Sequence, residues 1–229
     1  MARLRKLFCV LPLGLFVSAT VPAVAGDEAE IAKETWTDAL KDISLGPGTL
    51  NIGGSLRFRY EFYNNYNIKQ YGTEESDNML LERLRLDIDY RLQENLHAFV
   101  QLQDAHFWFS ELHADDFPPP CPHRNDLDLR QAFVEWKRIA DSPVGFKVGR
   151  QTIRYRDTRV WGPGDWGNVG RYVWDAAMLS LDTEAVTTDF IFGQRLLYDY
   201  DDFDDEHYDF DAYGAYSKFN QLPFDLDLF

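Results

Sequence analysis

The feature that most constrains the fold of this chain is a two-residue alternation of apolar and polar side chains that begins at Leu50. Between Leu50 and Phe62 the even positions hold apolar residues and one glycine, whereas the odd positions hold mainly polar or charged residues such as Arg57 and Arg59. Successive side chains of a β-strand point to opposite faces, so this period predicts a strand with one apolar and one charged face. Further runs of this kind lie at residues 80–92, 96–109, 127–138, 144–152, 177–181, 186–192, 210–219 and 226–229. The sequence therefore predicts an all-β protein of about eight to nine antiparallel strands.

The connections between these runs alternate between short and long. Only Gln93, Glu94 and Asn95 separate the second run from the third, whereas the polar stretches at residues 64–78 and 110–125 are long. Short turns on one side and long loops on the other are typical of outer-membrane β-barrels, whose apolar faces meet lipid and whose charged faces line a lumen. We therefore expect residues 49–229 to form part of an antiparallel transmembrane β-barrel. The alternative is a secreted, carbohydrate-binding β-sandwich, in which the apolar faces pack together as a core.

The last run does not have the pattern of a closing strand. Asp225 and Asp227 occupy the alternating positions before the terminal aromatic residue, Phe229. An open sheet edge would leave unpaired backbone groups in lipid. We therefore expect an incomplete barrel, and we expect these 229 residues to be a fragment or to need more chain to function.

The N-terminus has the pattern of a secretory signal peptide. Arg3, Arg5 and Lys6 precede an apolar run at residues 7–17, and the small-x-small sequence at residues 23–25 predicts cleavage after residue 25. The apolar run is too short for a spanning helix, which needs roughly 20 residues. Residues 1–25 are therefore predicted to be a signal peptide and the mature protein to be secreted to the outer membrane.

Residues 26–48 are expected to form a short helical segment before the first strand. Apolar residues lie on one side of a helix drawn from Asp27 to Ile43, acidic residues concentrate at its start, and Gly46-Pro47-Gly48 would end it. Such a helix is either a periplasmic cap or a leader without a special role.

Charge and cysteine content exclude several classes of function. Removal of the signal peptide leaves 20 basic against 38 acidic residues, a net charge of −18, so nucleic acid is not an expected partner. Cys121 would be the one remaining cysteine, so no disulfide holds the fold. No zinc spacing and no catalytic motif occurs, and we expect neither a metal site nor an enzyme. The acidic stretch at residues 199–211 offers oxygen ligands for calcium but lacks EF-hand spacing, which favours a solvated loop and no cofactor.

One stretch, Gly149 to Asp175, is cationic although the protein is acidic. It contains five arginines, three tryptophans and the turn sequence Gly162-Pro163-Gly164. Together with two strand segments it resembles the alginate export family of outer-membrane porins. The residues that carry the resemblance are Asp128-Leu129-Arg130-Gln131-Ala132-Phe133-Val134, Val148-Gly149-Arg150-Gln151 and the more specific Tyr155-x-Asp157-x-Arg159-x-x-Gly162-Pro163-x-Asp165-Trp166-x-Asn168-x-Gly170-Arg171.

The resemblance implies a monomeric pore in the bacterial outer membrane that passes a polyanionic polysaccharide through an arginine-rich constriction. It extends more loosely from Leu50 to the C-terminus and corresponds to about the first half of an eighteen-stranded family barrel. The partners it implies are outer-membrane lipid, an anionic saccharide or another anionic solute, and periplasmic export components.

The arginines are the candidate substrate-binding residues, because guanidinium groups bind carboxylates in two-point geometry and keep their charge. The predicted pore lining consists of Arg57, Arg59, Arg83, Arg85, Arg130, Arg150, Arg154, Arg159 and Arg171. Asp157, Asp165, Trp161 and Trp166 are predicted to support the loop, and the two tryptophans either stack on sugar rings or pack the loop down. Alternatively, the arginines pair with acidic neighbours in ion networks between strands.

Overall fold

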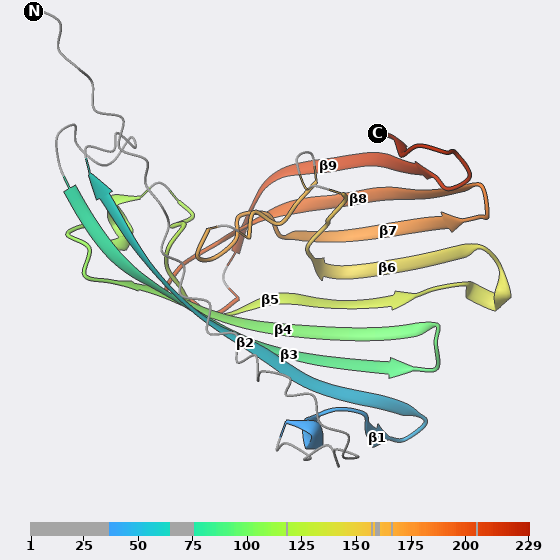
Figure 1. Ribbon diagram of the computed structural model, residues 1–229, viewed down its shortest axis with the longest axis horizontal. Coiled ribbons are helices and arrows are strands. Elements are labelled where there is room, and N and C mark those ends of the chain that lie inside the picture. The colour runs from blue at the N-terminus through green and yellow to red at the C-terminus, as the bar shows by residue number, and fades with distance from the viewer. Residues whose placement is uncertain are drawn as a thin grey trace, which may run out of the picture.

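The computed structural model describes residues 37–64, 76–117, 119–156, 158, 161–165, 167–204 and 206–229. The predicted signal peptide lies outside these residues. The described chain consists of β-strands and three single turns of 3-10 helix (Figure 1). In chain order the elements are η1 (Asp38–Leu40), β1 (Ile43–Leu45), β2 (Gly48–Asn64), β3 (Ser76–Leu92), β4 (Leu96–Trp108), η2 (Ala114–Asp116), β5 (Asn125–Trp136), η3 (Ile139–Asp141), β6 (Val144–Gln151), β7 (Trp174–Asp182), β8 (Val186–Tyr198), β9 (Glu206–Phe219) and β10 (Leu226–Leu228).

The strands form one antiparallel sheet in which each strand pairs with the next in sequence. Its order runs from β1 to β10 without a crossover, and its two outer strands are not paired with each other, so the sheet is curved but open (Figure 1). The longest ladder, between β2 and β3, extends from Thr49 opposite Arg91 to Asn64 opposite Ser76. This architecture confirms the all-β prediction. The described residues form a single sheet with no second sheet packed on it, so the β-sandwich alternative is wrong.

The apolar face of the sheet is exposed along its whole width. Leu56, Leu84 and Phe190 are 57%, 47% and 40% exposed, although a core would bury such residues. Large contiguous apolar surfaces of this kind mark contact with a membrane or another protein. The exposed apolar side chains of the strands include Leu56, Phe58, Tyr60, Phe62, Leu84, Leu86, Ile88, Val134, Trp136, Phe146, Val148, Leu179, Leu181, Phe190 and Phe192. This face therefore fits the lipid-facing side of an outer-membrane barrel.

No helix in the described part of the chain is long and apolar enough to cross a membrane.

The buried residues lie under loops that fold onto the opposite, charged face of the sheet. The β4–β5 loop (residues 109–124) buries Met79 and Leu81 of β3 beneath Phe117 and Cys121. A second cluster joins Ile153 and Trp161 of the β6–β7 loop (residues 152–173) to buried side chains of β7 and β8. Packing on this face thus depends on the loops and not on a second layer of strands.

The N-terminal segment differs from the prediction of a helix up to Ile43. Its described part forms only the turn η1 and then the short strand β1, whereas residues 27–36 lie outside the described part of the chain. Gly46 adopts a positive φ of 59°, and this turn brings Leu45 opposite Gly48. Pairing of β1 with β2 is therefore preferred over the helix that the narrow apolar stripe predicted. As a result the sheet of the described residues has ten strands, whereas eight to nine were predicted.

Candidate functional site

The β6–β7 loop lies across the charged face instead of extending away from the sheet (Figure 1). Its own hydrogen bonds give it a compact shape: the amide of Tyr155 donates to the carbonyl of Trp161 at 3.1 Å, and that of Tyr172 donates to Pro163 at 3.1 Å. Gly164 takes a positive φ of 65° in the predicted Gly-Pro-Gly turn. Glycine adopts this conformation without steric cost, so the turn is built into the sequence.

Asp165 is the point on which the arginines converge. Its carboxylate accepts hydrogen bonds from Arg85 at 3.0 Å, Arg130 at 3.2 Å and Arg154 at 2.8 Å. Its backbone carbonyl accepts two more, from Arg57 at 3.3 Å and Arg83 at 3.4 Å. In the described residues, five guanidinium groups therefore contact this one residue. They come from strands β2, β3 and β5 and from the loop itself.

The position of Arg130 depends on an irregularity between β4 and β5. Gln101 pairs with Gln131 and Leu102 pairs with Leu129, so Arg130 is an extra residue on β5. A bulge of this kind turns a side chain away from the face that strict alternation would give it. Arg130 consequently lies on the charged face, where its side chain is only 3% exposed.

Asn168 fixes the loop to the strands through neutral hydrogen bonds. Its Nδ2 lies 2.8 Å from the carbonyl oxygen of Glu82, 2.9 Å from that of His106 and 2.8 Å from that of His123. The residue is fully buried. An amide nitrogen carries only two protons, so two of the three carbonyls receive a well-aligned hydrogen bond at any moment.

The first residues of the loop are held by the strands near the C-terminal edge of the sheet, β8 to β10. The Tyr155 hydroxyl donates to Asp189 of β8 at 2.6 Å, and its ring stacks on Tyr216 of β9 with the centroids 3.8 Å apart. Arg156 forms ion pairs with Asp225 at 3.0 Å and with Asp227 of β10. The loop is therefore anchored near β2 and β3 at one end and near β8 to β10 at the other.

The electrostatics around Asp165 favour its ionised form. Burial alone would raise its pKa, but the charges of Arg85 and Arg130 outweigh this effect and hold the pKa below its ordinary value. Five positive charges meet one negative charge among these contacts, so an excess of positive charge remains. Three loop arginines among the described residues are exposed: Arg154, with a side chain 57% exposed, Arg156, which pairs with Asp225, and Arg171.

The structure brings together Arg57, Arg83, Arg85, Arg130 and Arg154 of the predicted set, with Asp165 as the predicted support. Arg59 instead pairs with Glu61 at 2.6 Å. Trp161 packs against Trp174, with ring centroids 5.4 Å apart, as a loop-packing residue would. Asp157, Arg159 and Trp166 lie outside the described residues.

Arg150 is the exception among the predicted pore-lining residues. It pairs in register with Ala132 and Asp175, and Val148 two positions earlier belongs to the exposed apolar face. Alternation therefore places Arg150 on that face, apart from the other arginines, and its role in lining the lumen stays a prediction. Its guanidinium binds Asp175 at 3.0 Å and Asp204 at 2.8 Å, as the ion-network alternative predicted.

Sequence reasoning missed three residues that hold the site. Asn168 and Asp189 anchor the loop, and Gln103 accepts from Nε of Arg85 at 2.8 Å. Asn168 does occur in the motif that resembled a known family, which was the one available signal. Its partners are backbone carbonyls of distant segments, which leave no trace in the sequence pattern.

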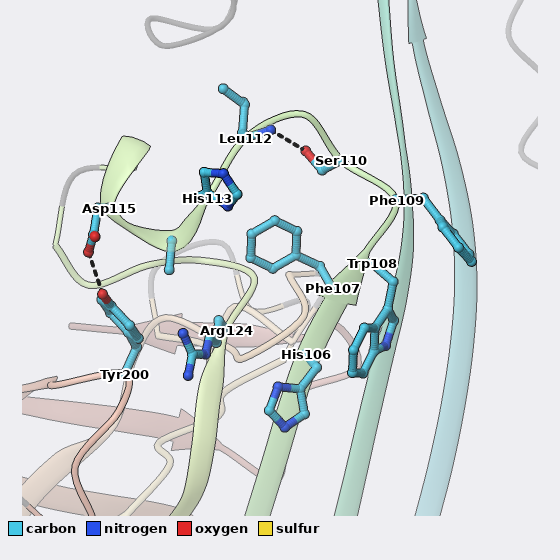
Figure 2. Close-up of a pocket in the computed structure, with 11 residues that line it drawn as sticks. His106, Phe107, Trp108, Phe109, Ser110, Leu112, His113, Asp115, Arg124 and Tyr200 are labelled. Carbon is cyan, nitrogen blue, oxygen red and sulfur yellow. Dashed lines mark hydrogen bonds between the residues drawn. The ribbon is translucent and has the colours of Figure 1, made fainter.

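A hollow of about 630 Å³ lies apart from the loop, at the end of β4 (Figure 2). It is lined by residues of β4 and of the β4–β5 loop, Arg124 included, and by Tyr200, but by none from the β6–β7 loop. Arg124 is held in two-point contact by Asp126, at 2.8 and 2.6 Å. The hollow is therefore not part of the arginine site.

The acidic stretch predicted as a solvated loop contains one compact group. Among the described residues, ligand atoms of Asp199, Asp201 and Asp202 lie within 4.8 Å of one another, and Asp201 and Asp202 are exposed. Exposed carboxylates commonly gather in this way without an ion, so the choice between a solvated loop and a calcium site stays a prediction.

Comparison with known proteins identifies one family. The family model described as alginate export matches residues 49–225, which include nearly all of the sheet and the whole β6–β7 loop. The comparison with curated proteins and the comparison with solved structures gave no match.

Proposed function

Since the chain belongs to the alginate export family, we propose that its sheet forms part of the wall of a passive channel for an anionic polysaccharide or another anionic solute. Membership of this transport family suggests a polysaccharide export channel and implies the bacterial outer membrane. The exposed apolar face supports a lipid-facing wall, and the charged face with its loop supports a lumen-facing surface. Outer-membrane lipid and periplasmic export components are the partners that this role requires.

The observation that carries the proposal is the convergence of five arginines on a loop that supplies one carboxylate to them. Guanidinium groups remain charged and bind carboxylates in a forked geometry. Charged rings on a pore surface raise the local concentration of ions of opposite sign and reject ions of the same sign. Arg154 is the exposed member of the five, and Arg171 is a further exposed arginine of the loop, so we expect an arriving anion to meet these two groups first.

Planar-bilayer recording of the protein that carries this chain tests the proposal. Replacing Arg154 and Arg171 with glutamine should lower the ratio of anion to cation permeability several-fold. The matched control is Arg91→Gln, because Arg91 is similarly exposed at 62% but lies at the turn end of β3 and pairs with Asp89. Equal selectivity in wild type and double variant, or an equal loss in the control, would refute selection by this loop.

A separate experiment addresses the lipid-facing wall. The purified protein should need detergent for solubility and should change its gel mobility on heating, as outer-membrane barrels do. A water-soluble protein after removal of residues 1–25 would contradict the membrane location.

A further inference from the structure

Asp165 is bound in the way that these arginines would bind a foreign carboxylate. Three guanidinium groups donate to its two carboxylate oxygens, with Arg85 and Arg130 on one oxygen and Arg154 on the other. The surrounding positive charge exceeds what a single aspartate neutralises. A site of this kind is complementary to a carboxylate, whether the carboxylate belongs to the protein or to a ligand.

We propose that Asp165 is an internal stand-in for the substrate, which occupies the carboxylate site until a carboxylate of the transported polymer replaces it. This inference rests on the proposed function and specifies how the same site works. The carboxylate-bearing saccharide takes over the hydrogen bonds of Arg85, Arg130 and Arg154, and the segment around Asp165 leaves the charged face.

The exposure of the arginines sets the order of the exchange. The side chain of Arg154 is 57% exposed and that of Arg171 is also open, whereas those of Arg85 and Arg130 are 12% and 3% exposed. Arg154 is both exposed and bonded to Asp165, so it links the open surface to the covered site. A carboxylate that binds Arg154 weakens the hold on Asp165 before it reaches the two covered arginines.

A tethered competitor makes the site selective for polymers. Asp165 is part of the loop, and a tethered group competes at an effective concentration on the order of millimolar. A free monosaccharide acid must exceed that concentration to displace it. A chain of such units already bound at the exposed arginines brings its next carboxylate to the site at a comparable local concentration. Neutral saccharides have no group that can replace Asp165.

Asp189 provides the control that separates exchange from simple loosening of the loop. It is also an aspartate that holds the loop, but it does so through the Tyr155 hydroxyl at 2.6 Å and Ser180 at 2.6 Å, with no arginine among these contacts. Asp165→Asn and Asp189→Asn remove the same charge and each remove one anchor. Only the first vacates a carboxylate site.

The experiment measures block of the channel current by a monomeric uronic acid, a uronic acid oligomer and a neutral hexose. Asp165→Asn should lower the half-blocking concentration of the monomer by at least tenfold and change that of the oligomer much less. Asp165→Glu retains a competing carboxylate and should restore the value of the wild type. Asp189→Asn keeps the competing carboxylate of Asp165 and should therefore change the half-blocking concentrations much less than Asp165→Asn does, even where it makes the loop more open to trypsin.

Equal shifts in Asp165→Asn and Asp189→Asn, or no shift in Asp165→Asn, would overturn the exchange mechanism. Failure of Asp165→Asn to fold would be seen as loss of heat-modifiable mobility. In that case Asp165→Glu decides. Its carboxylate still competes for the arginines, so the half-blocking concentration of the monomer should stay within a few-fold of the wild-type value, and a tenfold fall refutes the mechanism. The proposed function fails by a different result, namely a wild-type channel that does not distinguish the uronic acid from the neutral hexose.

Discussion

Replacement of Asn168 by aspartate tests whether hydrogen bonds or charge hold the β6–β7 loop on the sheet. The two side chains have nearly the same shape, so the change adds charge without adding volume. Arg57 lies 3.4 Å from Oδ1 of Asn168, and a purely electrostatic view predicts that a carboxylate here stabilises the docked loop. The three carbonyl oxygens around Nδ2 lead to the opposite expectation, that a carboxylate destabilises the docked loop, because a carboxylate has no proton to donate to them.

The magnitudes favour the hydrogen bonds. Each buried carbonyl left without its donor costs about 1–3 kcal/mol, so the loss of two donated bonds costs about 2–6 kcal/mol. A stronger, charge-assisted bond to Arg57 returns about 1.5–3 kcal/mol. The aspartate also places an anionic oxygen against carbonyl oxygens, which the neutral substitution Asn168→Ala does not do. We therefore expect Asn168→Asp to destabilise docking at least as much as Asn168→Ala.

Limited trypsin digestion in detergent measures the population of the undocked loop, since Arg154, Arg156 and Arg171 are cleavage sites within it. Where opening is fast relative to cleavage, the cleavage rate follows that population. A loss of about 2 kcal/mol corresponds to an increase of roughly 30-fold in the undocked fraction. Wild-type protection in Asn168→Asp, with faster cleavage in Asn168→Ala, would refute the reasoning and show that charge dominates.

Three further outcomes follow from the same geometry. Gly170→Ala should open the loop to trypsin, because the new Cβ would lie 2.4 Å from Nη2 of Arg130 at a φ of +92°, whereas Gly167→Ala, with its nearest neighbour at 3.6 Å, should change little. Leu86→Arg should destabilise the protein folded in vesicles by about 2–4 kcal/mol, and Leu86→Ala by much less, as measured by urea titration. Equal effects would contradict a lipid-facing position. The pKa of Asp165 is lowered, so its contribution to docking is complete above the ordinary pKa near 4 and is lost as the pH falls through the lower folded value. Pepsin cleavage of the loop should therefore rise more below pH 4 in the wild type than in Asp165→Asn, in which only the ion pair of Arg156 with Asp225 and similar anchors still weaken on acidification.

The period-two alternation predicted the shared face of Arg57, Arg83 and Arg85, because the face of a regular strand depends only on parity. Alternation does not predict the face of a residue where a bulge in the pairing with a neighbouring strand shifts the register. Arg130 reaches the charged face through an extra residue on β5. The register of β6 with β7 places Arg150 beside Asp175 on the other face. The position of Arg130 does not follow from the local sequence, whereas parity with Val148 already places Arg150 on the apolar face.

The loop shows the same division between local and tertiary information. Its cationic composition and its Gly162-Pro163-Gly164 turn are visible in the sequence, and they predicted a compact element with a role in selectivity. Its anchors are not visible, because Asn168 binds backbone carbonyls of β3, β4 and the β4–β5 loop. The prediction that the helix before β2 reaches Ile43 was wrong for a related reason, since pairing of Ile43–Leu45 with β2 outweighed a weak local preference.

Ion pairs and neutral contacts have different roles in the loop. Gathering five arginines around one aspartate is unfavourable unless something other than ion pairing holds the loop in place. The neutral hydrogen bonds of Asn168 and the packing of Tyr155 on Tyr216 supply that hold. The positive charge can then stay only partly neutralised. A loop held by ion pairs alone would need more carboxylates, and each added carboxylate would remove part of the attraction for an anionic polymer. Docking through neutral contacts therefore allows the site to be ordered and cationic at once.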